Sequence, residues 1–96
     1  MNISRLIWQH DIVEKLDVKH HVLPDEVEEV FANQPKIKRF QKGHYRGEDV
    51  YRALGQTDDG RYLVVFFILK LKLNGAALIL SARDMDDKER KEYGKK

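Results

Sequence analysis

Two arginines could form a phosphate-binding site in this chain. Arg61 opens one apolar stretch and Arg83 closes the next, with an Asn74-Gly75 turn between them. Antiparallel pairing about that turn would bring both guanidinium groups to one end of a sheet, where they could bind one phosphate bidentately. Each arginine could instead pair with a nearby acid, which is common and contributes little energy. The nearby acids are Asp58, Asp59, Asp84 and Asp86.

Three other residues could transfer or direct protons near such a site. His20 lies within Lys19-His20-His21, and its imidazole can act as an acid or a base near neutral pH. Cations at this position could equally cap the C-terminus of a helix. Glu89 and Tyr93 are four residues apart and would share one helix face. The Tyr93 hydroxyl could protonate a leaving oxygen, or the ring could only pack.

A basic stretch from residue 36 to residue 46 indicates a nucleic-acid ligand. It contains no acid and interleaves cations with Phe40, His44 and Tyr45, the combination that phosphate contact and base stacking require. The alternative is a solvated edge hairpin whose lysines discourage pairing with other chains. The predicted RNA-binding residues are Lys36, Lys38, Arg39, Lys42 and Arg46.

Several other classes of function are excluded by composition. The chain has no cysteine, so disulfides and thiolate metal sites are ruled out and a reducing compartment is favoured. No metal-ligand spacing, phosphate-binding glycine loop or nucleophilic triad is present. The longest apolar run, residues 62–69, is far too short to span a membrane, and residues 1–9 do not contain an apolar core of the length that a signal peptide needs. We predict a cytoplasmic protein with no metal, no cofactor and no membrane partner.

Helices are predicted at both ends of the chain. Apolar residues at helical spacing indicate a helix over residues 10–20. A second should begin at Pro24, which suits a first helical position, and should stop at Asn33-Gln34-Pro35. Asp86 and Glu89 form a capping box for a last, highly charged helix over about residues 87–93.

Four strands are predicted between these helices, over residues 36–41, 49–56, 61–73 and 76–83. Asp58-Asp59-Gly60 and Asn74-Gly75 are hairpin signals. The first strand should lie at an edge, and the third, apolar on both faces in its first half, should be central. We therefore predict that residues 1–96 form a single domain of the α+β class, with two N-terminal helices, a four-stranded mainly antiparallel sheet and a C-terminal helix.

Short motifs spaced over nearly the whole chain resemble the BrnT toxin family. Gly60-Arg61-Tyr62-Leu63-Val64-Val65, Ser81-Ala82-Arg83 and Glu89-Arg90 followed by Tyr93 occur in the family's order. Further pieces are Trp8, Lys19-His20 with Val22, Glu28-Glu29-Val30-Phe31 and Ala53-Leu54-Gly55-Gln56-Thr57. The resemblance is to a divergent member. Gln9 stands where the family usually has an acid, Ile12 and Leu16 stand where it has a lysine and an asparagine, and Val50 stands where it has an arginine.

The resemblance implies a RelE-like fold and a metal-independent endoribonuclease of a type II toxin-antitoxin system. In that activity an RNA 2′-hydroxyl attacks the adjacent phosphate. Arg61 and Arg83 would be the cations, His20 would transfer the proton, and Glu89 and Tyr93 would support the transfer. The implied partners are RNA and a ribbon-helix-helix antitoxin, BrnA-like, through which a dimer could form.

A second interpretation fits the departures from the family pattern. The apolar residues Ile12, Leu16 and Val50 replace polar groups, which would remove catalytic functions more readily than the fold. The alternative function is a non-catalytic protein-binding or RNA-binding domain of the same fold.

Overall fold

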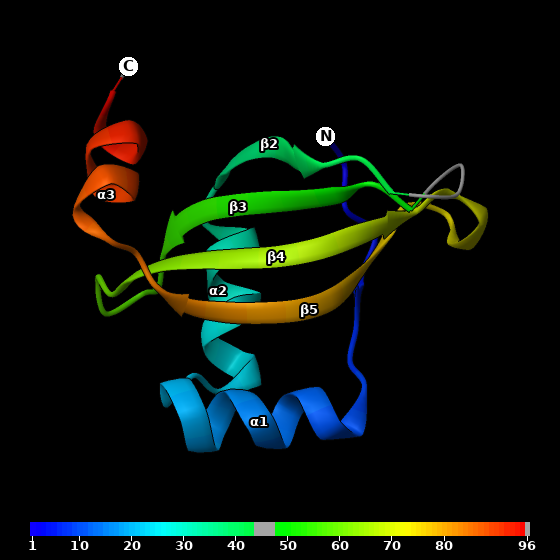
Figure 1. The fold of residues 1–96 in the computed structure, drawn as a ribbon, viewed down its shortest axis with the longest axis horizontal. Coiled ribbons are helices and arrows are strands. Elements are labelled where there is room, and N and C mark those ends of the chain that lie inside the picture. The colour runs from blue at the N-terminus through cyan, green and yellow to red at the C-terminus, as the bar shows by residue number, and fades with distance from the viewer. Residues whose placement is uncertain (44–47, 96) are drawn as a thin grey trace.

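The computed structural model describes residues 1–43 and 48–95. Its five-stranded sheet has the order β1-β5-β4-β3-β2, with β1 parallel to β5 and the other neighbours antiparallel (Figure 1). The elements are β1 (Leu6–Ile7), α1 (His10–His20), α2 (Pro24–Ala32), β2 (Lys36–Gln41), β3 (Val50–Gln56), β4 (Tyr62–Lys70), a 3₁₀ turn (Leu71–Leu73), β5 (Ala76–Asp84) and α3 (Asp87–Gly94).

The α+β class and most of the predicted elements are confirmed, but the sheet has five strands and not four. As predicted, β2 lies at an edge and β4 at the centre. The missed strand, β1, pairs only Leu6 with Ala77 and Ile7 with Leu78. Two residues are too few to show the alternation by which a strand is recognised.

The predicted strand over residues 61–73 was too long. Pairing between β4 and β5 ends at Lys70 with Ala76, and Leu71 and Leu73 are exposed in the turn that follows. Asn74 and Gly75 have positive φ angles of 57° and 78°. The alternation of leucine and lysine therefore continues beyond the point where a partner strand exists, and a five-residue connection replaces the predicted tight hairpin.

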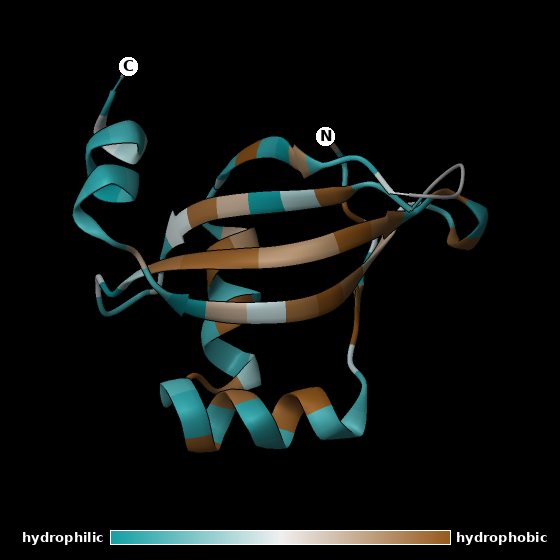
Figure 2. Ribbon diagram, viewed as in Figure 1, coloured by the Kyte–Doolittle hydropathy of each residue, from teal (hydrophilic) through white to brown (hydrophobic). Residues whose placement is uncertain are grey.

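Helix α2 lies behind the strands and α1 lies beside β5, and their apolar residues join one core on the side of the sheet here called the helix face (Figures 1 and 2). The core lies between them and the strands. At its centre Phe67 is fully buried, with ring centroids 5.3 Å from Phe31 and 5.8 Å from Tyr51. Alternate residues of β3 and β4 point into this core, which fixes the face on which every other residue of those strands lies.

Gly55 allows α2 to approach β3 closely. A Cβ atom at this position would lie 2.9 Å from Val30 Cγ1 and 3.2 Å from Pro35 Cβ. Both neighbours are held by packing, so a larger residue would push the end of α2 away from the sheet.

The opposite side of the sheet, here called the open face, carries a smaller apolar cluster next to α3. Leu54, Val64 and Met85 are buried there. Helix α3 begins with the predicted capping box: Asp86 accepts a 2.7 Å hydrogen bond from the Glu89 backbone, and the Glu89 carboxylate accepts one of 2.9 Å in return. None of the helices formed by the described residues has the length and apolar character needed to cross a membrane.

Candidate functional site

The register of the strands gathers cations on the open face. Lys38, Arg52, Phe66 and Ser81 are successive partners across β2, β3, β4 and β5. The adjacent row consists of Lys36, Leu54, Val64 and Arg83. Because residues two apart on a strand share a face, both rows belong to the same surface. Three cations lie on its β2 and β3 side and Arg83 lies on β5, with apolar residues between them.

Arg83 is held at the end of this face by α3. Its guanidinium donates two hydrogen bonds to Glu89, of 2.7 and 3.0 Å, and its Cζ lies 5.6 Å from the Phe66 ring centroid. The hydrogen bond to Glu89 raises the pKa of Arg83 and outweighs the opposing effect of burial. Arg83 is therefore a fixed cation beside an aromatic ring, with a carboxylate that orients it.

Tyr93 packs on the same side of the molecule. Its ring meets Tyr62 edge to face at 6.0 Å between centroids, and Lys36 Nζ lies 5.9 Å from the Tyr93 ring centroid. Glu89 and Tyr93 thus both face the sheet from α3. These contacts agree with packing, one of the two roles considered for Tyr93.

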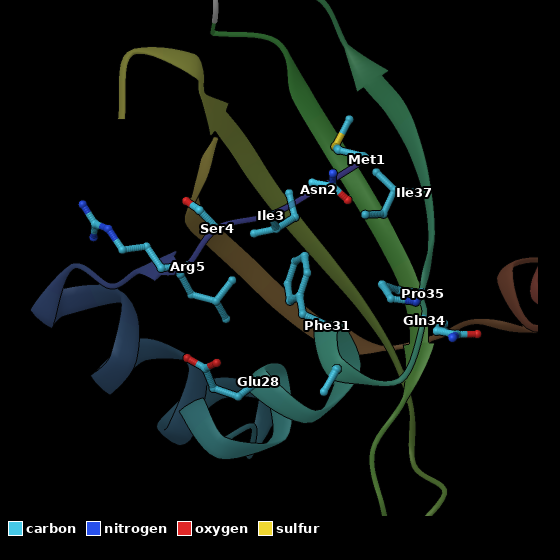
Figure 3. A pocket seen from close by; sticks show the side chains of 12 residues that line it. Met1, Asn2, Ile3, Ser4, Arg5, Glu28, Phe31, Gln34, Pro35 and Ile37 are labelled. Atoms are coloured by element: carbon cyan, nitrogen blue, oxygen red, sulfur yellow. The ribbon is translucent and has the colours of Figure 1, made fainter. Parts of the chain in front are cut away.

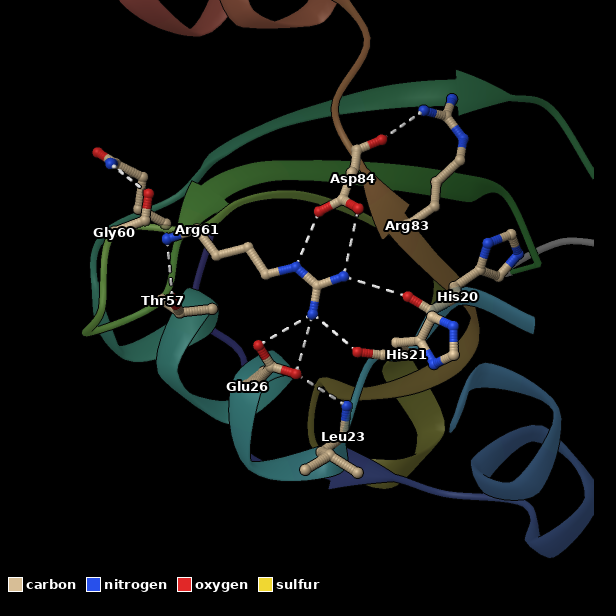
Figure 4. Close-up of polar contacts among 10 residues, drawn as sticks. His20, His21, Leu23, Glu26, Thr57, Gly60, Arg61, Arg83 and Asp84 are labelled. Carbon is tan, nitrogen blue, oxygen red and sulfur yellow. Dashed lines mark hydrogen bonds and ion pairs between the residues drawn. The ribbon is translucent and has the colours of Figure 1, made fainter. Parts of the chain in front are cut away.

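Arg61 lies on the helix face and is surrounded by acceptors (Figure 4). Its Nε donates to Asp84 at 2.8 Å, and one terminal nitrogen donates to the His21 carbonyl at 2.8 Å and to Glu26 at 3.1 Å. The other terminal nitrogen donates to the His20 carbonyl at 3.1 Å and to Asp84 at 3.3 Å. One side chain thereby joins the end of α1, the start of α2 and the end of β5.

The two arginines share one end of the sheet but project from opposite faces of it. Asp84 lies between them: its carboxylate accepts from Arg61, and its backbone carbonyl accepts a 3.1 Å hydrogen bond from Arg83. The hydrogen bond from Arg61 lowers the pKa of Asp84. Pairing of both arginines with acids, the alternative to a shared phosphate site, is present, although Arg83 pairs with Glu89, which was not among the four acids considered.

His20 ends α1 on the helix-face side of this junction. Its ring is half-buried and lines a cavity of about 160 Å³ together with Lys19 and Ser81. The structure connects His20 directly to Arg61 through its carbonyl. Lys19 and His20 also occupy the last turn of α1, where cations complement the helix dipole.

The predicted basic stretch is divided between the two faces. Lys36 and Lys38 lie on the open face, whereas Arg39 pairs across the strands with Tyr51 on the helix face and lies 3.6 Å from Asp49. Lys42 is exposed beyond β2. Arg46, with His44 and Tyr45, falls outside the described residues.

Two residues of the open face were not among the predicted site residues. Arg52 is partly buried in β3, and Glu92 of α3 contacts both Arg52 and Lys38. An arginine between apolar strand residues was a visible signal for Arg52. Glu92 gave none, because its partners lie 40 and 54 residues earlier in the chain.

A larger hollow lies elsewhere on the described surface. It measures about 810 Å³ and is bounded by residues 1–6, α2 and the start of β2 (Figure 3). Ile3, Phe31 and Ile37 form apolar parts of its wall. Among the described residues that line it there is none of the predicted catalytic or RNA-binding residues. The described residues also include no group of three or more His, Cys, Asp or Glu side chains that could hold a metal ion.

Comparison with solved structures gives the class of the fold. The chain is similar to the crystal structure of the Brucella abortus ribonuclease toxin BrnT, with a TM-score of 0.57 and 14% sequence identity over 90% of this chain and 100% of that one. Residues 8–89 match the family described as "Ribonuclease toxin, BrnT, of type II toxin-antitoxin system". This chain therefore belongs to the BrnT family of ribonuclease toxins. A search of curated protein sequences finds no match.

Proposed function

We propose that this chain is a toxin endoribonuclease that cleaves RNA on the open face of its sheet, near Arg83. Its family consists of type II ribonuclease toxins. The observation that carries the proposal for this site is the fixed Arg83–Glu89 pair at the end of β5, separated from the cations of β2 and β3 by apolar residues of the same face. A polyanion with stacked bases needs cations and apolar surface side by side.

The proposed reaction is attack of a 2′-hydroxyl on the adjacent phosphate, without a metal ion. The 2′-oxygen forms a bond to phosphorus and loses its proton, while the bond from phosphorus to the 5′-oxygen of the next nucleotide breaks and that oxygen takes up a proton. The products are a 2′,3′-cyclic phosphate and a 5′-hydroxyl end. Negative charge grows on the phosphate oxygens in this step, and Arg83 would stabilise it because Glu89 holds the guanidinium in place before the substrate arrives. We assign proton transfer between the reacting oxygens and the protein to His20, which lines a cavity at the edge of β5 together with Ser81 of the open face, with Glu89 and Tyr93 in support.

Arg61 takes a different part in this proposal. Its donors are already engaged with two carboxylates and two carbonyls, and a phosphate would have to replace several of these contacts. We therefore assign Arg61 the positioning of His20, whose carbonyl it binds, in place of direct contact with the phosphate.

A type II system pairs the toxin with a protein antitoxin. We propose that the antitoxin is a BrnA-like ribbon-helix-helix protein that inhibits the toxin, with any dimer formed through it, and that the pair acts in the cytoplasm. A RelE-like description of the fold belongs to the same proposal.

Arg83→Ala tests the assigned site. Purified variant and wild type would be compared for cleavage of single-stranded RNA, and each would be expressed without antitoxin to measure growth. Loss of a preorganised cation should lower the cleavage rate about 100-fold or more. Arg5→Ala, an exposed arginine outside the open face, is the matched control and should cleave like the wild type. Equal cleavage by wild type and Arg83→Ala would remove Arg83 from the mechanism.

The alternative is an RNA-binding domain without nuclease activity. It is favoured by α1, where Leu16 is only 3% exposed and packs into the core with Ile12, so these positions present no polar group to a substrate. This alternative predicts salt-sensitive RNA binding with no cleavage and no growth arrest by the wild type.

A further inference from the structure

A small cavity on the open face brings three cations of the sheet together with Lys95, which follows α3. It lies between β2, β3 and the second half of α3 and measures about 250 Å³. Lys36 and Lys38 line it from β2, Arg52 from β3, and Leu54 forms an apolar part of the wall. Three cationic side chains from two neighbouring strands converge here because they occupy adjacent rows of the sheet.

The acceptors of these cations come from one helix. Glu92 of α3 forms an ion pair with Arg52, and its other carboxylate oxygen lies 3.5 Å from Lys38 Nζ. Lys36 donates to the backbone carbonyls of Glu92 and Lys95. Partial burial would raise the pKa of Glu92, but the contacts with Arg52 and Lys38 together outweigh it and lower the pKa. The side chain is therefore a carboxylate anion at neutral pH.

The surroundings of the cavity suit a phosphate that belongs to a nucleic acid. Arg52 is the strand partner of Phe66, and the ring of Phe40 lies 5.0 Å from that of Phe66, with Phe40 57% exposed. An aromatic pair next to a phosphate-sized group of cations allows a base to stack while its phosphate is bound. An acidic protein segment would use the cations but not the exposed rings.

We propose that this cavity is a backbone-phosphate subsite for single-stranded RNA, and that the Glu92 carboxylate occupies it in the free chain. RNA binds by displacing Glu92 from Lys38 and Arg52. The identity of the ligand as RNA rests on the proposed function. The new element is that the Glu92 carboxylate competes with RNA for Lys38 and Arg52 and so weakens RNA binding.

Glu92 is suited to this role, whereas the neighbouring Glu89 is not. Glu89 is 8% exposed and closes the capping box of α3 as well as binding Arg83. The Glu92 side chain is 32% exposed, lies in the last turns of α3 and caps neither end of the helix. Its carboxylate can leave the cavity without the loss of a helix cap.

Glu92→Gln tests the proposal with a ligand that cannot be cleaved. Binding of a fluorescently labelled, fully 2′-O-methylated single-stranded RNA would be measured by anisotropy. Loss of the competing charge should tighten binding about 3- to 10-fold. Glu14→Gln is the matched control, because it makes the same substitution at an exposed position of α1, on the other side of the sheet, and should bind like the wild type.

Arg52→Ala in the wild-type and Glu92→Gln backgrounds completes the test. The gain from Glu92→Gln should disappear when Arg52 is absent, and thermal unfolding would show that each variant is folded. Equal binding by Glu92→Gln and Glu14→Gln, or no binding by any variant, would overturn the proposal. An equal gain for a polyglutamate peptide would also overturn it, in favour of an acidic protein ligand.

The binding test of the phosphate subsite can succeed or fail independently of the cleavage test of the nuclease assignment. A methylated RNA has no free 2′-hydroxyl, so its binding does not depend on catalysis. If unmodified RNA is not cleaved but the gain in Glu92→Gln persists, the nuclease assignment fails while the subsite stands.

Discussion

Arg61 and Arg83 lie at the same end of the sheet and differ in what surrounds them. Hydrogen bonds to carboxylates raise the pKa of both. Arg61 binds four residues from separate parts of the chain and acts as a structural joint. Arg83 binds one carboxylate beside Phe66, on a face that carries other cations. A shifted arginine pKa therefore indicates a binding site only when the neighbouring residues could also contact a ligand.

The helix face and the open face also differ at Phe66 and Phe67, which are adjacent in β4, and here we expect the largest effect on stability. Phe67 is fully buried on the helix face, whereas Phe66 is partly exposed on the open face. Phe67→Ala should lower the free energy of unfolding by about 3–5 kcal/mol, because it leaves a cavity. Phe66→Ala should lower it by about 1 kcal/mol. Urea denaturation of both variants measures the difference.

For RNA binding we expect the opposite order: among folded variants, Phe66→Ala should have a larger effect than Phe67→Ala. Phe66→Ala should weaken binding of the methylated RNA at a temperature where both variants remain folded, because Phe66 and Phe40 form the exposed aromatic pair. Weaker binding by Phe67→Ala than by Phe66→Ala under these conditions would contradict the division of the sheet into a packing face and a binding face.

A smaller effect on stability is expected for Arg61→Ala. It leaves Glu26, the Asp84 carboxylate and two carbonyls without their donor, and we expect a loss of about 2 kcal/mol, since the group is only partly buried. Arg61→Lys should recover less than half of this, because an ammonium cannot reproduce the fork of donors. Thermal and urea unfolding measure both. A smaller loss than that of Arg83→Ala would contradict the structural role.

The smallest expected effect is the acid dependence of the Arg61–Asp84 contact. The pKa of Asp84 is lowered from its ordinary value of 3.8, so its contribution is present above that value and is lost as pH falls through the folded-state pKa. Asp84→Asn should be less stable than the wild type by about 0.5 kcal/mol at pH 7, since the Asp84 side chain is exposed. The two should converge in unfolding measurements near pH 2. A difference that persists there would indicate a contribution other than charge.

Local periodicity predicted the elements of this chain well. The predicted strand over residues 49–56 is present with Leu54 on one face and Ala53 on the other, and the capping box of α3 formed as expected. Gly60 and Gly75 occur in turns with positive φ, where a side chain would be strained. These features depend on residues within a few positions of one another, so sequence alone contains them.

The features that sequence reasoning missed depend on distant partners. Strand β1 exists only because β5 offers an edge to two residues that lie about 70 positions earlier. The assignment of Arg61 and Arg83 to opposite faces required the register of β4 against β5. The contact of Glu92 with Arg52 required the position of α3 over the sheet, which no local pattern of charges specifies.

One side chain, Glu89, both stabilises the first turn of α3 and attaches this helix to β5. The same carboxylate accepts hydrogen bonds from the Asp86 backbone and from Arg83. If α3 moves away from the sheet without unfolding, the hydrogen bonds between Glu89 and Arg83 break. If the first turn of α3 unwinds, the Glu89 carboxylate no longer points at Arg83, and the same hydrogen bonds break. Detachment and unwinding of this helix are therefore coupled, and hydrogen exchange along α3 should report both as one cooperative event.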